Sequence, residues 1–319
     1  MKSFKAIIKN YDKFNTNIKL AKGVRLVLKN AETRHGMGGI SSNAYGEYWF
    51  NTNNGKALFK TYELYSQSDL RMVNEIVCSR LANQLSIPCA KYEPAYLNNA
   101  DKTKGVISYN FLNENQQIFS ISTFFRGEEV DTYNDIIKKF REKKNLFKID
   151  FNQIKNQLFS IMVFDLLTFQ TDRHLDNLSI IIEKGVVKLS PLYDNEFAFI
   201  NLNYTEKGKE NTIDEFVNLY FDGRKMIPVK KLNRENGLES YNNFVKQVVN
   251  LANSSEEFKN KFKQIISKAD LRPIYKSLIE EGYEINPEYM DFTIQLLDYS
   301  KQKMKQAFLE KSKQNDKGR

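Results

Sequence analysis

The sequence predicts an α+β fold with two unequal lobes, a β-rich amino-terminal lobe over residues 1–114 and a mostly α-helical carboxyl-terminal lobe over residues 115–319. Short β-type runs separated by turn residues fill most of the first part, and one helical segment lies among them. Apolar residues at helical spacing dominate the second part, and one hairpin interrupts them. The length of 319 residues also suits two domains, because a domain typically holds about 100–200 residues.

The amino-terminal lobe is expected to contain a small sheet. A cluster of turn residues at Asn51–Gly55 separates two β-type runs and predicts a hairpin. The strands expected in this lobe are, in chain order, Val24–Leu28, Gly46–Phe50, Lys56–Tyr62, Tyr92–Tyr96 and Gly105–Phe111.

One helix is predicted beside this sheet, over Ser68–Leu85. Ser68 is a suitable amino-terminal cap, and Pro88 marks the end of the helix. The apolar residues that recur at helical spacing are Leu70, Val73, Val77 and Leu81. We expect Glu75 to lie beside this buried stripe and not within it.

The carboxyl-terminal lobe is expected to be built around a long core helix at Phe151–Phe169, which carries a wide apolar face. A β-rich insert at Leu178–Phe199 follows this helix. Helices then resume over Phe244–Leu309, with breaks expected near Pro273 and Pro287.

The composition excludes a disordered chain. Hydrophobic residues make up 41% of the chain, and 23 Phe and 17 Tyr supply the aromatics that disordered chains lack. The net charge of +9 favours anionic partners such as nucleotide, acidic protein or nucleic acid, or it serves solubility alone. No run approaches the ~20 apolar residues of a membrane span, and the amino terminus has no secretory signal. A cytoplasmic protein without membrane contact is expected, and delivery as an effector by a signal-independent route is the alternative.

The two cysteines, Cys78 and Cys89, lie eleven positions apart with no histidine nearby. This spacing indicates neither a zinc site nor a disulfide framework. Both are expected to be core thiols in a reducing compartment.

The most informative segment runs from Phe169 to Asp194. A loop after the core helix carries Asp172 and, five residues later, Asn177. Two short strands joined by a turn follow, and Asp194 comes 22 residues after Asp172. Taken alone, Asp172 would be an ordinary turn residue. The order of helix, loop, hairpin and aspartate is much more specific.

Phosphoryl transfer explains this order. The transferred group needs an in-line acceptor and metal ions that neutralise charge, with little covalent chemistry from the protein. In kinases one Asp orients the acceptor hydroxyl, a nearby Asn ligates Mg²⁺, and an Asp after a hairpin holds the Mg²⁺ that bridges the phosphates. We therefore predict Asp172 as a catalytic residue and Asn177 and Asp194 as Mg²⁺ ligands, with ATP as the phosphoryl donor.

The segments Asp172–Asn177 and Leu189–Asp194 resemble the HipA-like kinases, whose catalytic loop has the form Asp-x-His-x-x-Asn. The Asp-Arg-His sequence is also similar to that of phosphatidylinositol kinases. The motif match covers Phe164–Phe199. The resemblance implies a two-lobed protein-kinase-like fold and an ATP- and Mg²⁺-dependent Ser/Thr protein kinase.

Weaker matches lie upstream of this segment. The Gly-rich turn Gly36–Asn43 would let backbone N–H groups cradle phosphates. Lys60 resembles the kinase lysine that pairs with the phosphates, and Glu75 resembles the helix glutamate that faces this lysine. The alternative for Lys60 is an exposed lysine at a strand end, and the alternative for Glu75 is a position on a solvated helix face. Tyr109 and Asn110 fall where the adenine-binding hinge is expected. The nucleotide-binding residues that the resemblance implies are Gly38, Gly39, Ser41, Ser42, Lys60, Glu75, Tyr109 and Asn110.

Some residues of the motif have two interpretations. The resemblance places His174 in the catalytic loop, where a hydrogen-bonding role is favoured over that of a general base. Arg173 would contact either a substrate phosphate or a carboxylate that stabilises the loop. Asn195–Glu196 stands where protein kinases have Phe-Gly, and no Ala-Pro-Glu segment follows, so the mode of substrate docking is open.

Three functions fit these observations. The first is a Ser/Thr protein kinase with an unidentified protein substrate, which the resemblance makes a candidate toxin held by an antitoxin-like partner. The second is a lipid or small-molecule kinase of the same fold. The third is a non-catalytic pseudokinase or toxin–antitoxin scaffold; no helix-turn-helix or zinc motif predicts sequence-specific nucleic-acid binding. Autophosphorylation of Ser41 or Ser42 is a further hypothesis.

Overall fold

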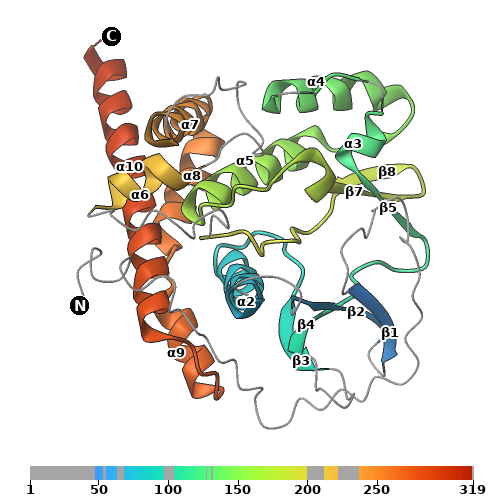
Figure 1. Cartoon of the computed structure of the whole chain (residues 1–319). Coiled ribbons are helices and arrows are strands. Elements are labelled where there is room, and N and C mark those ends of the chain that lie inside the picture. Colours follow the sequence, from blue (N-terminus) through green and yellow to red (C-terminus); the bar gives the residue numbers. More distant parts are fainter. Residues whose placement is uncertain are drawn as a thin grey trace.

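The computed structural model describes residues 47–52, 55–62, 68–96, 104–126, 128–130, 132–199, 212–221 and 237–317. These residues form a mixed α+β structure with two four-stranded sheets and several helices (Figure 1), which confirms the predicted class. The expected strand Val24–Leu28 lies outside the described residues. Four of the predicted nucleotide-binding residues also lie outside them: Gly38, Gly39, Ser41 and Ser42.

The first sheet is antiparallel throughout and confirms the predicted hairpin. Its strands lie in the order β1 (Glu47–Thr52), β2 (Gly55–Thr61), β4 (Lys104–Tyr109) and β3 (Tyr92–Tyr96). Gly105 of β4 pairs with Thr61 of β2. A Cβ atom on Gly105 would lie 2.2 Å from the carbonyl oxygen of Lys60, so a glycine is required where β4 approaches the strand that carries this lysine.

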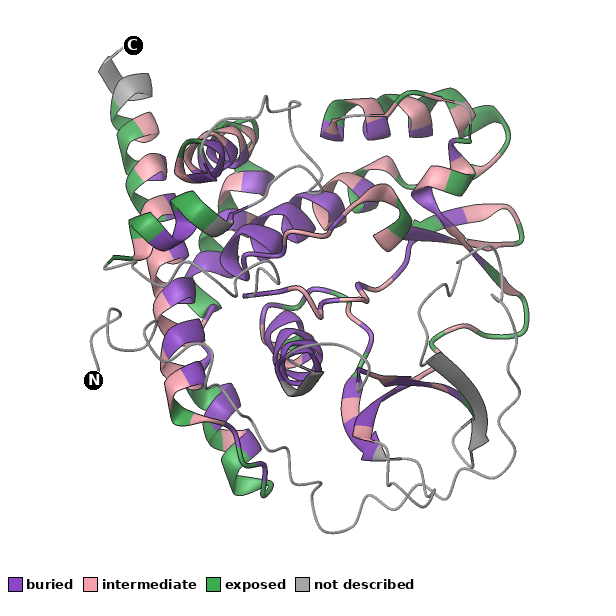
Figure 2. Cartoon of the chain, in the orientation of Figure 1, coloured by how far each residue is buried: buried purple, intermediate pink, exposed green. Residues whose placement is uncertain are grey.

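Helix α2 (Ser68–Gln84) packs against the first sheet and also against helix α9 (Arg272–Glu280). It is therefore buried around most of its circumference (Figure 2). Glu75 is 0% exposed and its neighbour Asn74 is 1% exposed. The expected position of Glu75 beside the buried stripe is wrong, because α2 is covered on more than one face.

The second sheet joins segments that are distant in the sequence. Its strands lie in the order β5 (Gln116–Ser120), β7 (Ser179–Glu183), β8 (Val186–Leu189) and β6 (Lys148–Ile149). The β7–β8 pair confirms the hairpin predicted within Leu178–Phe199, but the strand structure ends at Leu189. Beyond it only an isolated bridge links Leu192 to Cys89. Strands β5 and β6 were not predicted from the sequence, because these short strands depend on pairing with β7 and β8.

Helix α5 (Phe151–Leu167) confirms the predicted core helix, and all its residues from 158 to 167 are buried. The predicted breaks near Pro273 and Pro287 are confirmed, because helical structure stops at Lys268 and again at Glu280, and each proline lies in the first turn of the helix that follows. The other helices of the described residues are α3 (Ile121–Phe124), α4 (Tyr133–Glu142), α6 (Ile213–Tyr220), α7 (Gly237–Ala252), α8 (Glu256–Lys268) and α10 (Pro287–Lys317), with short 3-10 turns at η2 (Lys143–Asn145) and η3 (Leu175–Asn177). Across the described part of the chain, no helix combines the length and the apolar character needed to cross a membrane.

One hydrophobic core joins α2 to the helices that follow it (Figure 2). It contains Val77 of α2, Phe164 of α5, Leu278 of α9 and Phe292 of α10. A separate, smaller cluster lies on the first sheet and consists of Ala57, Phe59, Ala95 and Ile107. Helix α2 is thus held by the carboxyl-terminal helices as well as by the sheet.

Candidate functional site

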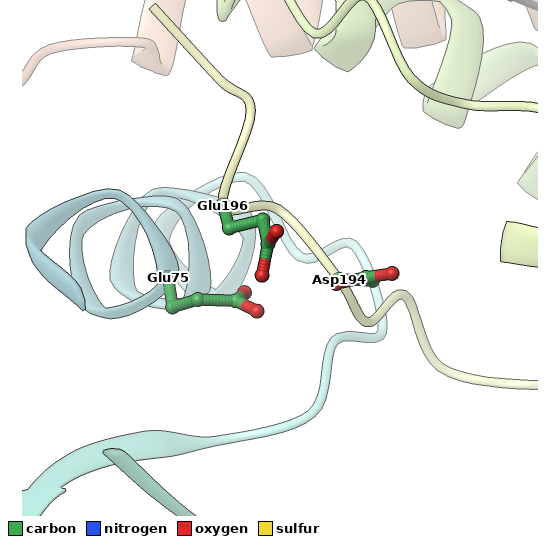
Figure 3. Close-up of side chains that lie close together, drawn as sticks. All are labelled: Glu75, Asp194 and Glu196. Carbon is green, nitrogen blue, oxygen red and sulfur yellow. The ribbon is translucent and has the colours of Figure 1, made fainter. Parts of the chain in front are cut away.

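Lys60 is surrounded by three carboxylates, of which Glu75 is buried and Asp194 and Glu196 are partly buried. We call these four residues the lysine cluster: Lys60, Glu75, Asp194 and Glu196. Its Nζ atom is 2.8 Å from Asp194 Oδ1, 3.4 Å from Glu75 Oε1 and 3.6 Å from Glu196 Oε2. Figure 3 shows the three acidic side chains converging from α2 and from the segment after β8. Lys60 is 6% exposed, so the alternative of a solvated lysine is excluded.

The local structure explains why these side chains meet. Phe59 belongs to the small apolar cluster on one face of the first sheet, so its neighbour Lys60 points to the other face. Glu75 is fixed at both of its oxygens: Tyr62 Oη donates to Oε1 at 3.3 Å, and the backbone N–H of Asn195 donates to Oε2 at 2.8 Å. Glu75 therefore connects the lysine strand to the segment that carries Asp194.

More acidic than basic side chains meet at the lysine cluster. Arg71 Nη1 lies 2.8 Å from Glu196 Oε1, so two cations face three carboxylates. Burial alone would lower the pKa of Lys60, but Asp194 and the other acidic groups around it raise that pKa well above its usual value. Lys60 is therefore an ammonium ion at neutral pH.

The carboxylates of the cluster differ in their tendency to ionise. Burial raises the pKa of Glu75 to about 7, although Lys60 acts against this shift. Burial also raises the pKa of Glu196. For Asp194, burial is outweighed by the charge of Lys60 and by the hydrogen bond from it, and the pKa of Asp194 is lowered. Asp194 is thus the carboxylate that most readily carries a negative charge.

Asp194 has an unusual backbone conformation. Its φ of 61° lies in the left-handed region, which costs a residue with a side chain roughly 1–2 kcal/mol. Its N–H donates to Tyr92 Oη at 3.3 Å, and Gln170 Nε2 donates to its carbonyl oxygen at 3.2 Å. Strained backbone that the surrounding structure holds in place is common at functional sites.

Asp172 and Asn177 lie on one loop after α5, as predicted. Asn177 Nδ2 donates to the carbonyl oxygen of Asp172 at 2.8 Å, which closes the loop. The N–H of Asp172 donates to Gln170 Oε1 at 3.1 Å. Because Gln170 also binds the carbonyl oxygen of Asp194, one side chain joins the loop to the end of the hairpin. The structure thus brings the three predicted residues to neighbouring positions.

His174 is a hydrogen-bond acceptor within this loop. The N–H of Asp176 donates to its Nδ1 at 3.2 Å, and its Nε2 lies 3.9 Å from Asp172 Oδ2. Asp176 in turn accepts a hydrogen bond from the hydroxyl of Ser122 in α3. This geometry agrees with the hydrogen-bonding interpretation of His174; a direct catalytic role of this residue stays a prediction.

Arg173 is fully buried and pairs with Asp165 of α5, with Nε–Oδ2 at 3.4 Å. It donates from Nη1 to the carbonyl oxygen of Tyr193 at 2.7 Å and from Nη2 to Asn195 Oδ1 at 2.6 Å. Of the two interpretations of Arg173, the salt bridge that stabilises the loop is the one observed. Arg173 therefore joins the loop after α5 to the residues on either side of Asp194.

Tyr109 and Asn110 lie where the first sheet continues into the second. Tyr109 ends β4 opposite Ala57, and the N–H of Asn110 donates to the carbonyl oxygen of Lys56 at 2.8 Å. Asn110 Oδ1 accepts the N–H of Leu112 at 3.1 Å, on the way to β5. This connection is the expected place of the hinge, and nucleotide contact here stays a prediction.

Four residues that hold the site together were not singled out from the sequence as site residues: Arg71, Asp165, Gln170 and Glu196. Asp165 could have been recognised from the sequence as a buried charged residue, because it is the sole acidic residue in the apolar run Ile161–Leu167. Glu196 was noted only as a departure from the kinase pattern. No sequence pattern pointed to Arg71 or Gln170. Arg71 pairs with a residue that is distant in the sequence, and Gln170 binds a backbone carbonyl oxygen.

One family model and two solved structures are similar to this chain. The family model described as HipA-like C-terminal domain matches residues 31–270. The crystal structure of the Helicobacter pylori proinflammatory kinase CtkA aligns with a TM-score of 0.62 at 16% identity, over 91% of this chain and 98% of that chain, which shows a shared fold. Shewanella oneidensis HipA, solved with HipB and operator DNA, aligns with a TM-score of 0.48 at 13% identity, over 96% of this chain and 71% of that chain.

No curated protein matches the sequence. The family match nevertheless extends over most of the chain and includes Lys60, Glu75, Asp172, Asn177 and Asp194. The protein belongs to the HipA-like C-terminal domain family.

Proposed function

We propose that this protein is an ATP- and Mg²⁺-dependent kinase that transfers the γ-phosphoryl group to a Ser or Thr hydroxyl of a protein. Family membership and the fold shared with CtkA support a kinase-type phosphotransferase with two lobes that meet near residue 114. The observation that carries the proposal is the convergence on Lys60 of Glu75 and Asp194, which are 15 and 134 positions away from it in the chain.

In this proposal Lys60 and Glu75 form the phosphate-binding pair. A buried ammonium ion donates charge-assisted hydrogen bonds that suit phosphate oxygens. Glu75, fixed by Tyr62 and by the N–H of Asn195, keeps Lys60 in place when a nucleotide competes with Asp194 for it. The residues proposed to cover the rest of the nucleotide are Gly38, Gly39, Ser41, Ser42, Tyr109 and Asn110.

Asn177 and Asp194 are the proposed Mg²⁺ ligands, and their chemistry fits this ion. Mg²⁺ takes oxygen ligands and needs one or two protein carboxylates. The amide nitrogen of Asn177 is used by the carbonyl oxygen of Asp172, which leaves the amide oxygen for the ion. Asp194 has a lowered pKa and is ionised. When bound, Mg²⁺ supplies charge neutralisation to the phosphates.

Asp172 is the proposed catalytic residue. Its side chain is 15% exposed, so an acceptor group has access to it while the surrounding protein holds it. Its carboxylate would accept a hydrogen bond from the acceptor hydroxyl and take the proton as the new oxygen–phosphorus bond forms. His174, beside it, would help to orient that carboxylate.

The test is phosphoryl transfer from ATP labelled at the γ-position, with Mg²⁺ and a generic acidic protein, by the wild type and by Asp194→Asn. We expect label in protein with the wild type and a loss of at least about 100-fold in the variant. Label in an added lipid or small alcohol, but not in protein, would reassign the acceptor. A wild type that neither transfers label nor is stabilised by Mg²⁺–ATP would disprove the proposal and favour a non-catalytic scaffold.

An antitoxin-like protein partner is a further proposal, and it rests on the family alone. Such a partner would hold the kinase inactive. Co-purification of a second protein with the chain, followed by recovery of kinase activity when the two are separated, would support it. A chain that purifies alone with unchanged activity would contradict it.

A further inference from the structure

A hydrogen bond connects the start of helix α10 to helix α2, next to the candidate site. The hydroxyl of Tyr289, in the first turn of α10, donates to Asn74 Oδ1 in α2. The two residues are 215 positions apart in the sequence. Tyr289 is 0% exposed and Asn74 is 1% exposed, so this hydrogen bond is shielded from water.

Asn74 extends this contact to the segment that carries Asp194. Its Nδ2 donates to the carbonyl oxygen of Glu196 at 3.1 Å and to that of Ala198. With Oδ1 held by Tyr289, the amide plane is fixed, and both of its N–H bonds are directed at the backbone after Asp194. The chain of contacts therefore runs from Tyr289 through Asn74 to the Asp194–Ala198 segment.

The Asp194–Ala198 segment depends on such support. Asp194 has a φ of 61°, and the neighbouring Phe199 has a φ of 58°, so strained residues lie at both ends. Asn74 binds two carbonyl oxygens between them. Loss of this support would let the segment relax and would move the Asp194 carboxylate away from Lys60.

Two more contacts tie α2 to the carboxyl-terminal helices. Arg80 binds both oxygens of Glu281, after α9, at 2.6 Å each, and Gln84 Nε2 donates to the carbonyl oxygen of Lys268 at 2.8 Å. In protein kinases, the position of the corresponding helix controls whether the Lys–Glu pair forms. Here the helix that carries Glu75 is attached to the ends of α8 and α9 and to the start of α10.

We propose that Tyr289 is a positioning residue of the active site, and that the docking of α10 on α2 sets the geometry of the metal-binding Asp194 through Asn74. The inference rests on the proposed kinase function. Helix α10 would then take part in regulation, because any displacement of its start would lower both the affinity for the metal ion and the rate of phosphoryl transfer.

The test compares Tyr289→Phe with a matched variant, Tyr275→Phe. Tyr275 of α9 is also a buried tyrosine, and its hydroxyl shares a hydrogen bond of 2.7 Å with Thr293 Oγ1, one turn further along α10. Each variant loses one buried hydroxyl, but only Tyr289 contacts Asn74. Two quantities are measured on the full chain: Mn²⁺ binding in the presence of ADP, from the electron paramagnetic resonance signal of the free ion, and kcat for transfer of label from ATP.

We expect Tyr289→Phe to weaken Mn²⁺ binding and to lower kcat by roughly three- to tenfold, the effect of one buried hydrogen bond, while Tyr275→Phe changes neither. Equal values in the two variants, with an active wild type, would overturn the inference and leave the kinase function intact. If Tyr289→Phe does not fold, Mn²⁺ binding is measured on Asn74→Ser instead. Unchanged Mn²⁺ binding in that variant would also overturn the inference. A wild type without nucleotide binding or transfer would sink both the kinase function and this inference.

Discussion

The two halves of the candidate site are held together by different forces. In the lysine cluster, ion pairs join Lys60 to a buried and a partly buried side chain, 15 and 134 positions away in the sequence. In the loop after α5, hydrogen bonds join residues that are 2 or 5 positions apart, such as Asp172 with Gln170 and Asn177 with Asp172. The cluster therefore depends on the whole fold and on charge balance, whereas the loop depends on local geometry. We expect substitutions in the cluster to damage stability and activity together, and substitutions in the loop to damage mainly activity.

The largest effect is expected from Lys60→Met. The variant leaves Glu75, Asp194 and Glu196 close together without their central cation, and breaking a buried ion pair costs about 3–5 kcal/mol. Transfer of label should fall by at least about 100-fold because the phosphate-binding group is lost. Urea unfolding and the kinase assay measure the two losses. Lys56→Met, on an exposed position of the same strand, is the control, and equal stability of the two variants would contradict the charge-balance argument.

The next largest effect is expected on the pH dependence of the free energy of unfolding. Burial raises the pKa of Asp165 to about 6, although Arg173 opposes the shift. Because the folded state binds this proton more tightly than the unfolded state, the stabilising contribution is complete at pH values below the usual pKa of Asp and is lost as the pH rises through 6. The loss amounts to about 3 kcal/mol at 1.36 kcal/mol per unit of pKa.

Asp165→Asn should remove this part of the pH dependence. The free energy of unfolding, measured with urea between about pH 4 and pH 8, is expected to fall less steeply in the variant than in the wild type. Parallel curves for the two proteins would show that Asp165 is ionised over the whole range and that its pairing with Arg173 outweighs its burial.

A smaller effect on stability is expected in the loop. Asn177→Ala removes the hydrogen bond to the carbonyl oxygen of Asp172 and should lower the free energy of unfolding by only about 1 kcal/mol. Activity should nevertheless fall by at least about 100-fold, since the variant removes a proposed metal ligand. Asn177→Asp keeps an oxygen ligand and should retain more activity than Asn177→Ala at high Mg²⁺. The reverse order would contradict the assignment of Asn177 as a ligand.

The smallest effect is expected at the far end of α2. Glu281→Gln weakens the ion pair between Glu281 and Arg80. Because the Glu281 side chain is 40% exposed, the free energy of unfolding should change by less than about 1 kcal/mol, and the change should vanish in high salt. Thermal unfolding at low and high salt measures this change. A large loss of activity in this variant would show that the Arg80 contact, and not the Tyr289 contact, positions α2.

The elements with strong local patterns were predictable from the sequence. The spacing of apolar residues in α5 and α2, the turn residues before β2 and the apolar runs of β7 and β8 on either side of a turn all reflect local preferences. Strands β5 and β6 were missed because they are stabilised by pairing with distant segments. The breaks near Pro273 and Pro287 were also predictable, because proline disrupts the interior of a helix and is tolerated in its first turn.

Local patterns in the sequence were enough to predict the α+β class, the resemblance to the family and three candidate site residues, Asp172, Asn177 and Asp194, because spacing along the chain reflects a loop and a hairpin. Three features became visible only in the folded chain: Glu75 is buried, Glu196 lies close to Lys60, and α10 forms a hydrogen bond with α2. These contacts join residues from distant parts of the chain. Their energies depend on burial and on the sum of nearby charges, which no local pattern of residues records.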